Sequence, residues 1–149
     1  MYECWTDGSY KPTIDAGGYS AIITQNGEII KKLYAGYSHT TNNRMELLGV
    51  LEALKWFKTP SIILIHSDSQ YIVESIIHNR VQQWIKEKDD SKKNMDLWCQ
   101  IIKLLDYHTV TFKWVKGHNK NKMNELADLL AQHAAECLEL PIDHGYINY

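Results

Sequence analysis

The sequence lacks any apolar run approaching the roughly 20 residues that a membrane-spanning helix needs. Its start also lacks the basic-then-apolar pattern of a signal peptide, so we expect a cytoplasmic protein. Cysteine is scarce: Cys4, Cys99 and Cys137 lie far apart in the chain. Their spacing matches neither a zinc site nor a disulfide framework. We therefore expect free thiols that are buried or half-buried.

Basic residues are not in excess, because 16 Lys and Arg stand against 18 Asp and Glu, for a formal net charge of −2. Proteins that bind nucleic acids usually carry a basic surface, so any such binding here must rest on a local patch and on metal ions. Repeats, low-complexity segments and linkers are also lacking. The 149 residues, 44% of them apolar, suit a single domain over 1–149 with 138–149 as a tail of unassigned role.

Hydrophobic periodicity predicts an α/β protein that begins with three strands. The pair Asn26-Gly27 is typical of a type I′ hairpin turn, because both central positions of that turn take positive φ. The expected strands cover residues 2–10, 18–24, 28–37, 61–66 and 109–115, and the expected helices cover residues 42–58, 70–78, 95–106 and 122–137. The order βββαβα, an optional helix and then αβα indicates a mixed sheet with helices packed on it.

The polar segment 79–94 carries charges of both signs, and we expect an exposed excursion there. Trp84 lies within it and could pack either on a nucleic acid or on the excursion itself. The other tryptophans lie in predicted strands or helices. We expect these side chains in the core: Trp5, Trp56, Trp98 and Trp114.

Four carboxylates lie where the predicted structure changes. Asp7 is near the end of the first strand, Glu46 in the first turns of a helix, Asp68 just past the buried strand 61–66, and Asp128 on the last helix. If the first and fourth strands are neighbours, Asp7 and Asp68 lie close together. Converging carboxylates suit Mg²⁺, which prefers oxygen ligands and often binds substrate phosphate as well. Two such ions about 4 Å apart can support phosphodiester hydrolysis.

Each carboxylate also has an ordinary structural explanation. Asp7 could be a turn residue, and Glu46 could be the acidic partner in a helix-capping arrangement. Asp68 could cap the helix that follows it, and Asp128 could be one charge on a solvated helix face. Each signal is weak by itself, and the surrounding sequence decides.

Five motifs surround these residues: TDGS (6–9), TTNNRMEL (40–47), SDSQY (67–71), NMDLW (94–98) and WVKGHNKNKMNELAD (114–128). In order and spacing they resemble those of the bacterial type-I ribonuclease H family, over about residues 4–136. The resemblance implies the ribonuclease H-like fold, a five-stranded mixed sheet flanked by helices on both faces. It also implies a monomeric endonuclease that hydrolyses the RNA strand of RNA–DNA hybrids. Two Mg²⁺ ions, or Mn²⁺ as a substitute, would serve catalysis and leave 5′-phosphate and 3′-hydroxyl ends.

The same resemblance assigns roles to individual residues. It makes Asp7, Glu46, Asp68 and Asp128 catalytic metal ligands, and His118 a loop residue that helps proton transfer or product release. The pKa of an unperturbed histidine lies near neutrality, which suits that role. Uncharged contacts to the hybrid are also implied. Asn42, Asn43 and Gln70 match family residues that contact the hybrid, and Asn94 matches one that contacts a DNA-strand phosphate. Thr41, beside the asparagines, and Trp84, an aromatic among basic residues, are further contacts that we expect from the sequence itself. The 2′-hydroxyl, which distinguishes RNA from DNA, is a natural partner for such groups. Helix capping remains an alternative for Asn94, and capping by 41–43 is compatible with substrate contact.

The sequence departs from the family pattern at three places. The loop 10–18 has fewer glycines, and the excursion is shorter and carries Glu87, Asp89 and Asp90. In the tail, the third place, we expect Asp143 and His144 to be solvated rather than metal ligands.

Two alternative functions stay open on the same fold. One is a non-catalytic nucleic-acid-binding domain, although such a domain would have lost a carboxylate. The other alternative is a different nuclease or a resolvase, but such an enzyme would not explain the TTNNRMEL motif or the loop histidine.

Overall fold

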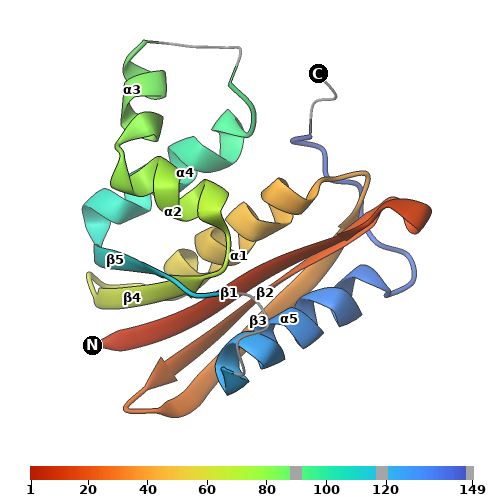
Figure 1. Cartoon of the computed structure of the whole chain (residues 1–149), viewed down its shortest axis with the longest axis horizontal. Helices are drawn as coiled ribbons and strands as arrows, with labels where there is room; N and C mark the ends of the chain where they lie inside the picture. The colour runs from red at the N-terminus through yellow and green to blue at the C-terminus, as the bar shows by residue number, and fades with distance from the viewer. Residues whose placement is uncertain (88–91, 117–120, 147–149) are drawn as a thin grey trace.

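The computed structural model describes residues 1–87, 92–116 and 121–146 (Figure 1). Its strands are β1 (Tyr2–Lys11), β2 (Ala16–Gln25), β3 (Glu28–Ser38), β4 (Ile62–Ser67) and β5 (Thr109–Trp114). Its helices are α1 (Asn42–Trp56), α2 (Gln70–Ile77), α3 (Arg80–Lys86), α4 (Met95–Tyr107) and α5 (Lys122–Ala135), with a short 3-10 turn, η1 (Pro12–Ile14), after β1. None of the helices in these described ranges is long and apolar enough to cross a membrane.

The strands form one mixed sheet in the order β3-β2-β1-β4-β5. β1, β2 and β3 pair antiparallel, whereas β4 pairs parallel with both β1 and β5. The hairpin between β2 and β3 turns at Asn26 and Gly27, whose φ angles of 53° and 80° are both positive. The predicted type I′ positions are therefore confirmed, and so is the mixed five-stranded sheet.

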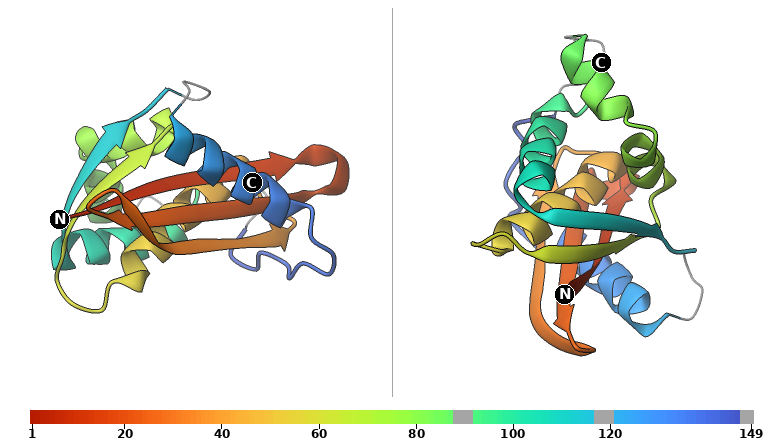
Figure 2. Two further views of the ribbon diagram at one scale, coloured as in Figure 1. Left: turned by 90° about the horizontal axis from the view of Figure 1, so that it is seen from below. Right: turned by 90° about the vertical axis from the view of Figure 1, so that its left-hand side faces the viewer.

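Helices cover both faces of the sheet. α1 to α4 lie on one face and α5 lies alone on the other (Figures 1 and 2). The main core is on the first face, where Trp98 of α4 is fully buried in one cluster with Ile65 of β4. A smaller cluster under α5 includes Trp5 and Ala127. The predicted fold class, a sheet flanked on both faces, is confirmed.

Helix α1 packs closely on the sheet because a glycine lies at the contact on each side, Gly8 in β1 and Gly49 in α1. A Cβ added to Gly8 of β1 would lie 2.6 Å from the carbonyl carbon of Met45. A Cβ on Gly49 of α1 would lie 2.9 Å from the carbonyl oxygen of Ser20. Only hydrogen fits at both positions, so the backbone of α1 rests directly on the strand.

The segment 79–94 is not simply an exposed excursion. Residues Arg80–Lys86 form α3, in which Val81 is fully buried. Trp84 is half-buried against the main core, and the Lys92 ammonium lies 5.4 Å from the centre of its ring. The optional helix therefore exists, and the local-packing interpretation of Trp84 is observed. Residues 88–91, with Asp89 and Asp90, lie outside the described residues.

Two expectations about individual side chains were wrong. Trp114 is 44% exposed rather than in the core, because it ends the edge strand β5. Cys137 is exposed, whereas Cys4 is buried and Cys99 half-buried as expected.

Up to residue 146, where the described part of the chain ends, the tail is not a solvated extension. Ile142 forms a parallel bridge to Ser38 at the end of β3. Asp143 is 7% exposed and pairs with Arg44 of α1, although the neighbouring His144 is exposed. The ion pair accounts for the burial of a residue that sequence reasoning placed in solvent.

Candidate active site

The strand register brings Asp7 and Asp68 together. The last pair between β1 and β4 is Thr6 with Ser67, so Asp7 and Asp68 are the next residues along two parallel strands. Asp7 is still within β1 and pairs with Ser20 of β2. Asp68 begins the turn into α2. The expectation that these carboxylates would be neighbours is confirmed, because their oxygens lie within 4.8 Å of each other.

Glu46 reaches the same point from α1. The helix begins after Thr41, whose hydroxyl accepts a hydrogen bond from the Arg44 N–H. Close contact at Gly8 then places the second turn of α1 beside Asp7. One carboxylate oxygen from each of Asp7, Glu46 and Asp68 lies within 4.8 Å of the others.

Burial and mutual repulsion make this cluster a poor place for negative charge. Asp7 is 2% exposed and Glu46 is 5% exposed. Burial, followed by the charge of Asp68, raises the pKa of Asp7 to about 8, although the Gly8 N–H partly opposes the shift. Burial, and then the charges of Asp7 and Asp68, raise the pKa of Glu46 well above its usual range. A bound cation would lower both pKa values again, because it stabilises the ionised carboxylates.

The donor set fits a hard divalent cation. All three side chains offer carboxylate oxygens, the ligand type that Mg²⁺ prefers. Glu46 Oε2 is buried and has no hydrogen-bond partner among the described residues. Such an atom is costly unless something binds it. These residues could therefore hold a metal ion.

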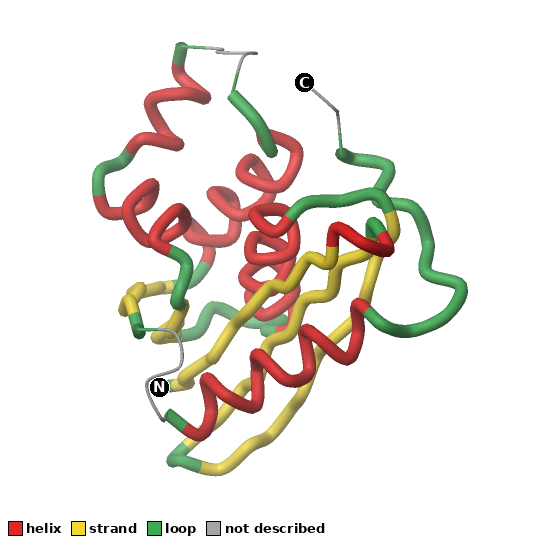
Figure 3. The backbone as a smooth tube through the Cα atoms, turned by 45° about the vertical axis from the view of Figure 1, so that its right-hand side comes forward, coloured by secondary structure: helices red, strands yellow, loops and turns green. Residues whose placement is uncertain are grey.

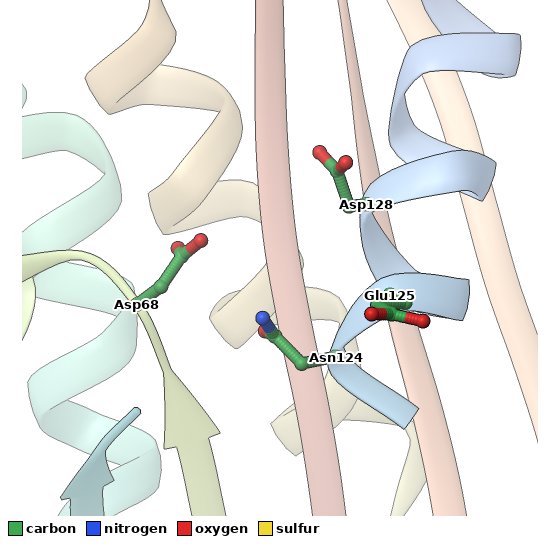
Figure 4. Close-up of a pocket in the computed structure, with 4 residues that line it drawn as sticks. All are labelled: Asp68, Asn124, Glu125 and Asp128. Carbon is green, nitrogen blue, oxygen red and sulfur yellow. The ribbon is translucent and has the colours of Figure 1, made fainter. Parts of the chain in front are cut away.

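Asp128 approaches from the opposite face of the sheet. α5 is held on β2 by the Ser20 hydroxyl, which donates to the Ala127 carbonyl at 2.5 Å. A small polar pocket lies between Asp68 on one side and Asn124, Glu125 and Asp128 of α5 on the other (Figure 4). Asp128 is half-buried and accepts a hydrogen bond from Gln132 at 2.9 Å. It borders the carboxylate site without belonging to the three-residue cluster.

The geometry excludes the ordinary structural explanations for three of the four carboxylates. Asp7 lies within a strand rather than in a turn. The side chain that caps α2 is Ser69, not Asp68. Thr41 caps α1, and Glu46 lies beyond the third helical position, where a capping box would need it. For these three residues the structural alternatives do not hold.

Most of the predicted contact residues lie at or just before the starts of helices. Asn42 and Asn43 are exposed at the start of α1, and Gln70 is exposed at the start of α2. Asn94 is half-buried before α4, and its side chain does not cap that helix. Helix capping is observed for Thr41 and excluded for the Asn94 side chain. Substrate contact by all of them stays a prediction, and His118 lies outside the described residues.

Sequence reasoning missed two features beside the site. Asn124 is 3% exposed and lines the pocket with Asp128. The i, i+4 spacing of the two residues on a helix could have indicated this. Trp114 donates its indole N–H to the Asp68 carbonyl at 3.3 Å. No sequence signal connects residues so far apart in the chain.

The model of the RNase H family matches residues 1–136. The chain belongs to the ribonuclease H family. A curated ribonuclease H of Pseudoalteromonas translucida is 44% identical over 148 residues, which cover 97% of this chain and 96% of the relative. The predictions that the chain resembles bacterial ribonucleases H and is an enzyme of that family are confirmed.

Solved structures share the fold. LC9-RNase H1, described as a type 1 RNase H with the type 2 active-site motif, has a TM-score of 0.77 at 27% identity, covering 90% of this chain and 71% of that one. A foamy viral protease-reverse transcriptase, solved with an RNA/DNA hybrid, has a TM-score of 0.76 at 19% identity. That match covers 91% of this chain but only 20% of the viral chain, and it supports the fold alone.

Proposed function

We propose that this protein is an endonuclease that hydrolyses the RNA strand of RNA–DNA hybrids, leaving 5′-phosphate and 3′-hydroxyl ends. The observation that carries the proposal is the cluster of Asp7, Glu46 and Asp68 in a chain of the ribonuclease H family. Buried carboxylates that repel one another in the free protein are suited to hold cations against a phosphodiester.

Asp7, Glu46, Asp68 and Asp128 would hold two Mg²⁺ ions, with Mn²⁺ as a substitute. When bound, these ions lower the pKa of coordinated water and neutralise charge at the scissile phosphate. Beyond the effect of burial, the charges of Asp68 and Asp128 both raise the pKa of Asp7, so its carboxylate lies within electrostatic reach of both. Asp7 would contribute its carboxylate oxygens to the metal site from β1. His118 would carry a proton at the leaving oxygen or assist product release.

The exposed amides of Asn42, Asn43 and Gln70 would select the RNA strand. Asn42 and Asn43 begin α1, the helix that carries Glu46, and Gln70 begins α2, just after the turn that carries Asp68. Both strands of a hybrid carry the same phosphates, so charge cannot distinguish them. Uncharged groups can distinguish them by hydrogen-bonding 2′-hydroxyls next to the cleavage site.

The deciding experiment is a cleavage assay on four labelled substrates: RNA–DNA hybrid, double-stranded DNA, double-stranded RNA and single-stranded RNA. Each is incubated with Mg²⁺ and, separately, with chelator. We expect cleavage of the hybrid alone, only with Mg²⁺, and only in its RNA strand. End-labelling of the products should show 5′-phosphate and 3′-hydroxyl groups. Equal cleavage of double-stranded DNA, or full activity in chelator, would contradict the proposal.

A further inference from the structure

Arg44 of α1 is a buried arginine with a role that the carboxylate site does not explain. Its side chain is 2% exposed and lies between the carboxylates of Asp96 and Asp143. Two guanidinium nitrogens donate to the oxygens of Asp96, at 2.9 and 2.7 Å, and Nε donates to Asp143 at 2.7 Å. Because two carboxylates offset its single charge and little of it is exposed, Arg44 is not itself placed to bind a phosphate.

Asp143 belongs to residues 141–146, which we call the strap. The strap returns from the end of α5 to the loop before α1 (Figure 3). The Ser38 N–H donates to the Pro141 carbonyl at 2.8 Å, and the Asp143 N–H donates to the Ser38 carbonyl at 3.0 Å. The Thr40 hydroxyl donates to the Asp143 carboxylate at 2.7 Å. The strap therefore holds Asp143 rigidly against the start of α1.

Arg44 also contacts Asn94. Arg44 Nη1 donates to Asn94 Oδ1 at 3.3 Å. Arginine has donors only, so it selects the oxygen of the amide and turns the NH₂ group to the other side. There the NH₂ group lies 3.4 Å from the Tyr71 hydroxyl, which also accepts from the Trp98 indole at 2.8 Å. An NH₂ group has two hydrogens, so one remains to donate to an oxygen outside the protein.

We propose that the strap positions Asn94, the residue that the family resemblance places on a DNA-strand phosphate: Asp143 fixes Arg44, and Arg44 orients the Asn94 amide so that its NH₂ group is free to donate to that phosphate. Arg44 and Asp143 are positioning residues in this arrangement, and Asn94 is the group that touches the substrate. The inference rests on the proposed function.

Charge and positioning make opposite predictions for Asp143→Asn. Removing a negative charge from a protein that binds a polyanion should tighten binding on electrostatic grounds alone. The strap model predicts weaker binding, because the neutral amide no longer fixes Arg44. Loss of one hydrogen bond to a charged phosphate corresponds to a rise in Kd of about tenfold. The control is Glu139→Gln, which removes the same charge from an exposed position just before the strap.

The test is a double-mutant cycle in hybrid binding. The Kd of a labelled hybrid is measured in chelator for the wild type, Asp143→Asn, Asn94→Ala and the double variant. Each single variant should weaken binding, and the double variant should bind no more weakly than Asn94→Ala. The dependence of log Kd on log salt should keep its slope, because no cationic contact is lost. Additive effects, or tighter binding by Asp143→Asn, would overturn the inference.

A second variant covers the case in which Asp143→Asn is too unstable to measure. Asn94→Asp keeps an oxygen for Arg44, so the fold should be retained, but it has no N–H to give to a phosphate. We expect Kd to rise by more than it does in Asn94→Ala, with an unchanged or higher melting temperature. Binding as tight as that of the wild type would refute the assignment. If the wild type itself binds no hybrid in this assay, that result contradicts the proposed function and not the positioning role of the strap.

Discussion

Replacing Asp7 by asparagine should stabilise the metal-free protein, although it should abolish activity. The pKa of Asp7 rises from 3.8 to about 8 on folding, chiefly because the carboxyl is buried and then because of Asp68. Between these values the native state holds a proton that the unfolded state has lost. The contribution of Asp7 to stability is therefore complete below about pH 4 and is lost as the pH rises toward 8.

The size of the effect follows from the same shift. Each pKa unit corresponds to about 1.4 kcal/mol, and roughly three units separate 3.8 from neutral pH, so the ionisation penalty is at most about 4 kcal/mol. The amide oxygen of the introduced asparagine would still accept from the Gly8 N–H, which now donates to Asp7 at 2.9 Å. The new NH₂ group must find an acceptor among the neighbouring carboxylates. We therefore expect a net gain of about 1–2 kcal/mol, or a melting temperature higher by roughly 3–8 °C.

The measurement is thermal unfolding of wild type and Asp7→Asn in chelator at pH 4, 5.5 and 7. The difference should grow with pH and shrink when excess Mg²⁺ is added, because the cation stabilises the ionised wild type. Asp106→Asn, on the exposed side of α4, is the control and should change little at any pH. The reasoning fails if Asp7→Asn is less stable than the wild type at pH 7, or if the difference does not depend on pH.

Four further outcomes can be checked. Asp68→Asn should abolish Mg²⁺-dependent cleavage while circular dichroism stays unchanged, and more than a tenth of wild-type activity would contradict its role as a ligand. His118→Ala should slow turnover by about 100-fold without abolishing it, whereas a change within twofold would make it an ordinary surface residue. Lysine at the three acidic positions within 87–90 should tighten hybrid binding and steepen its salt dependence; an unchanged slope would mean that this segment does not touch nucleic acid. Asn43→Ala should mainly raise KM. The wild type should cut a DNA duplex with one ribonucleotide poorly and a duplex with about four consecutive ribonucleotides well, and equal cleavage of the two substrates would exclude recognition through successive 2′-hydroxyls.

Features governed by local chemistry could be predicted from the sequence. The Asn26-Gly27 turn needs only two residues that tolerate positive φ, and the structure has both. Likewise, the neighbouring placement of Asp7 and Asp68 follows from the parallel pairing of the two strands that precede them. Motif resemblance added Glu46, whose position beside Asp7 depends on the close approach of a helix at Gly8.

Features that depend on distant partners could not be predicted. Arg44 and Asp143 are 99 residues apart in the chain, and nothing local in the tail indicates a buried ion pair. Trp114 alternates correctly with the inward residues of β5, but the strand is at the sheet edge and Trp114 is its last residue. The polar composition of residues 79–94 gave no sign of the short helix α3, in which Val81 is the one buried residue.

The placement of α5 on the far face of the sheet has a consequence for synthesis on the ribosome. Asp7, Glu46 and Asp68 all lie in the first half of the chain, whereas Asp128 arrives on the last helix, anchored through Ser20 and Ala127. A nascent chain that has emerged only as far as β5 already carries every residue of the three-carboxylate cluster, but the small cluster under α5 is still uncovered. The fourth carboxylate is added when α5 covers that face. On the proposed assignment, covering the small hydrophobic cluster and completing the nuclease site are therefore the same late event, and a chain that stops before α5 carries an unfinished site.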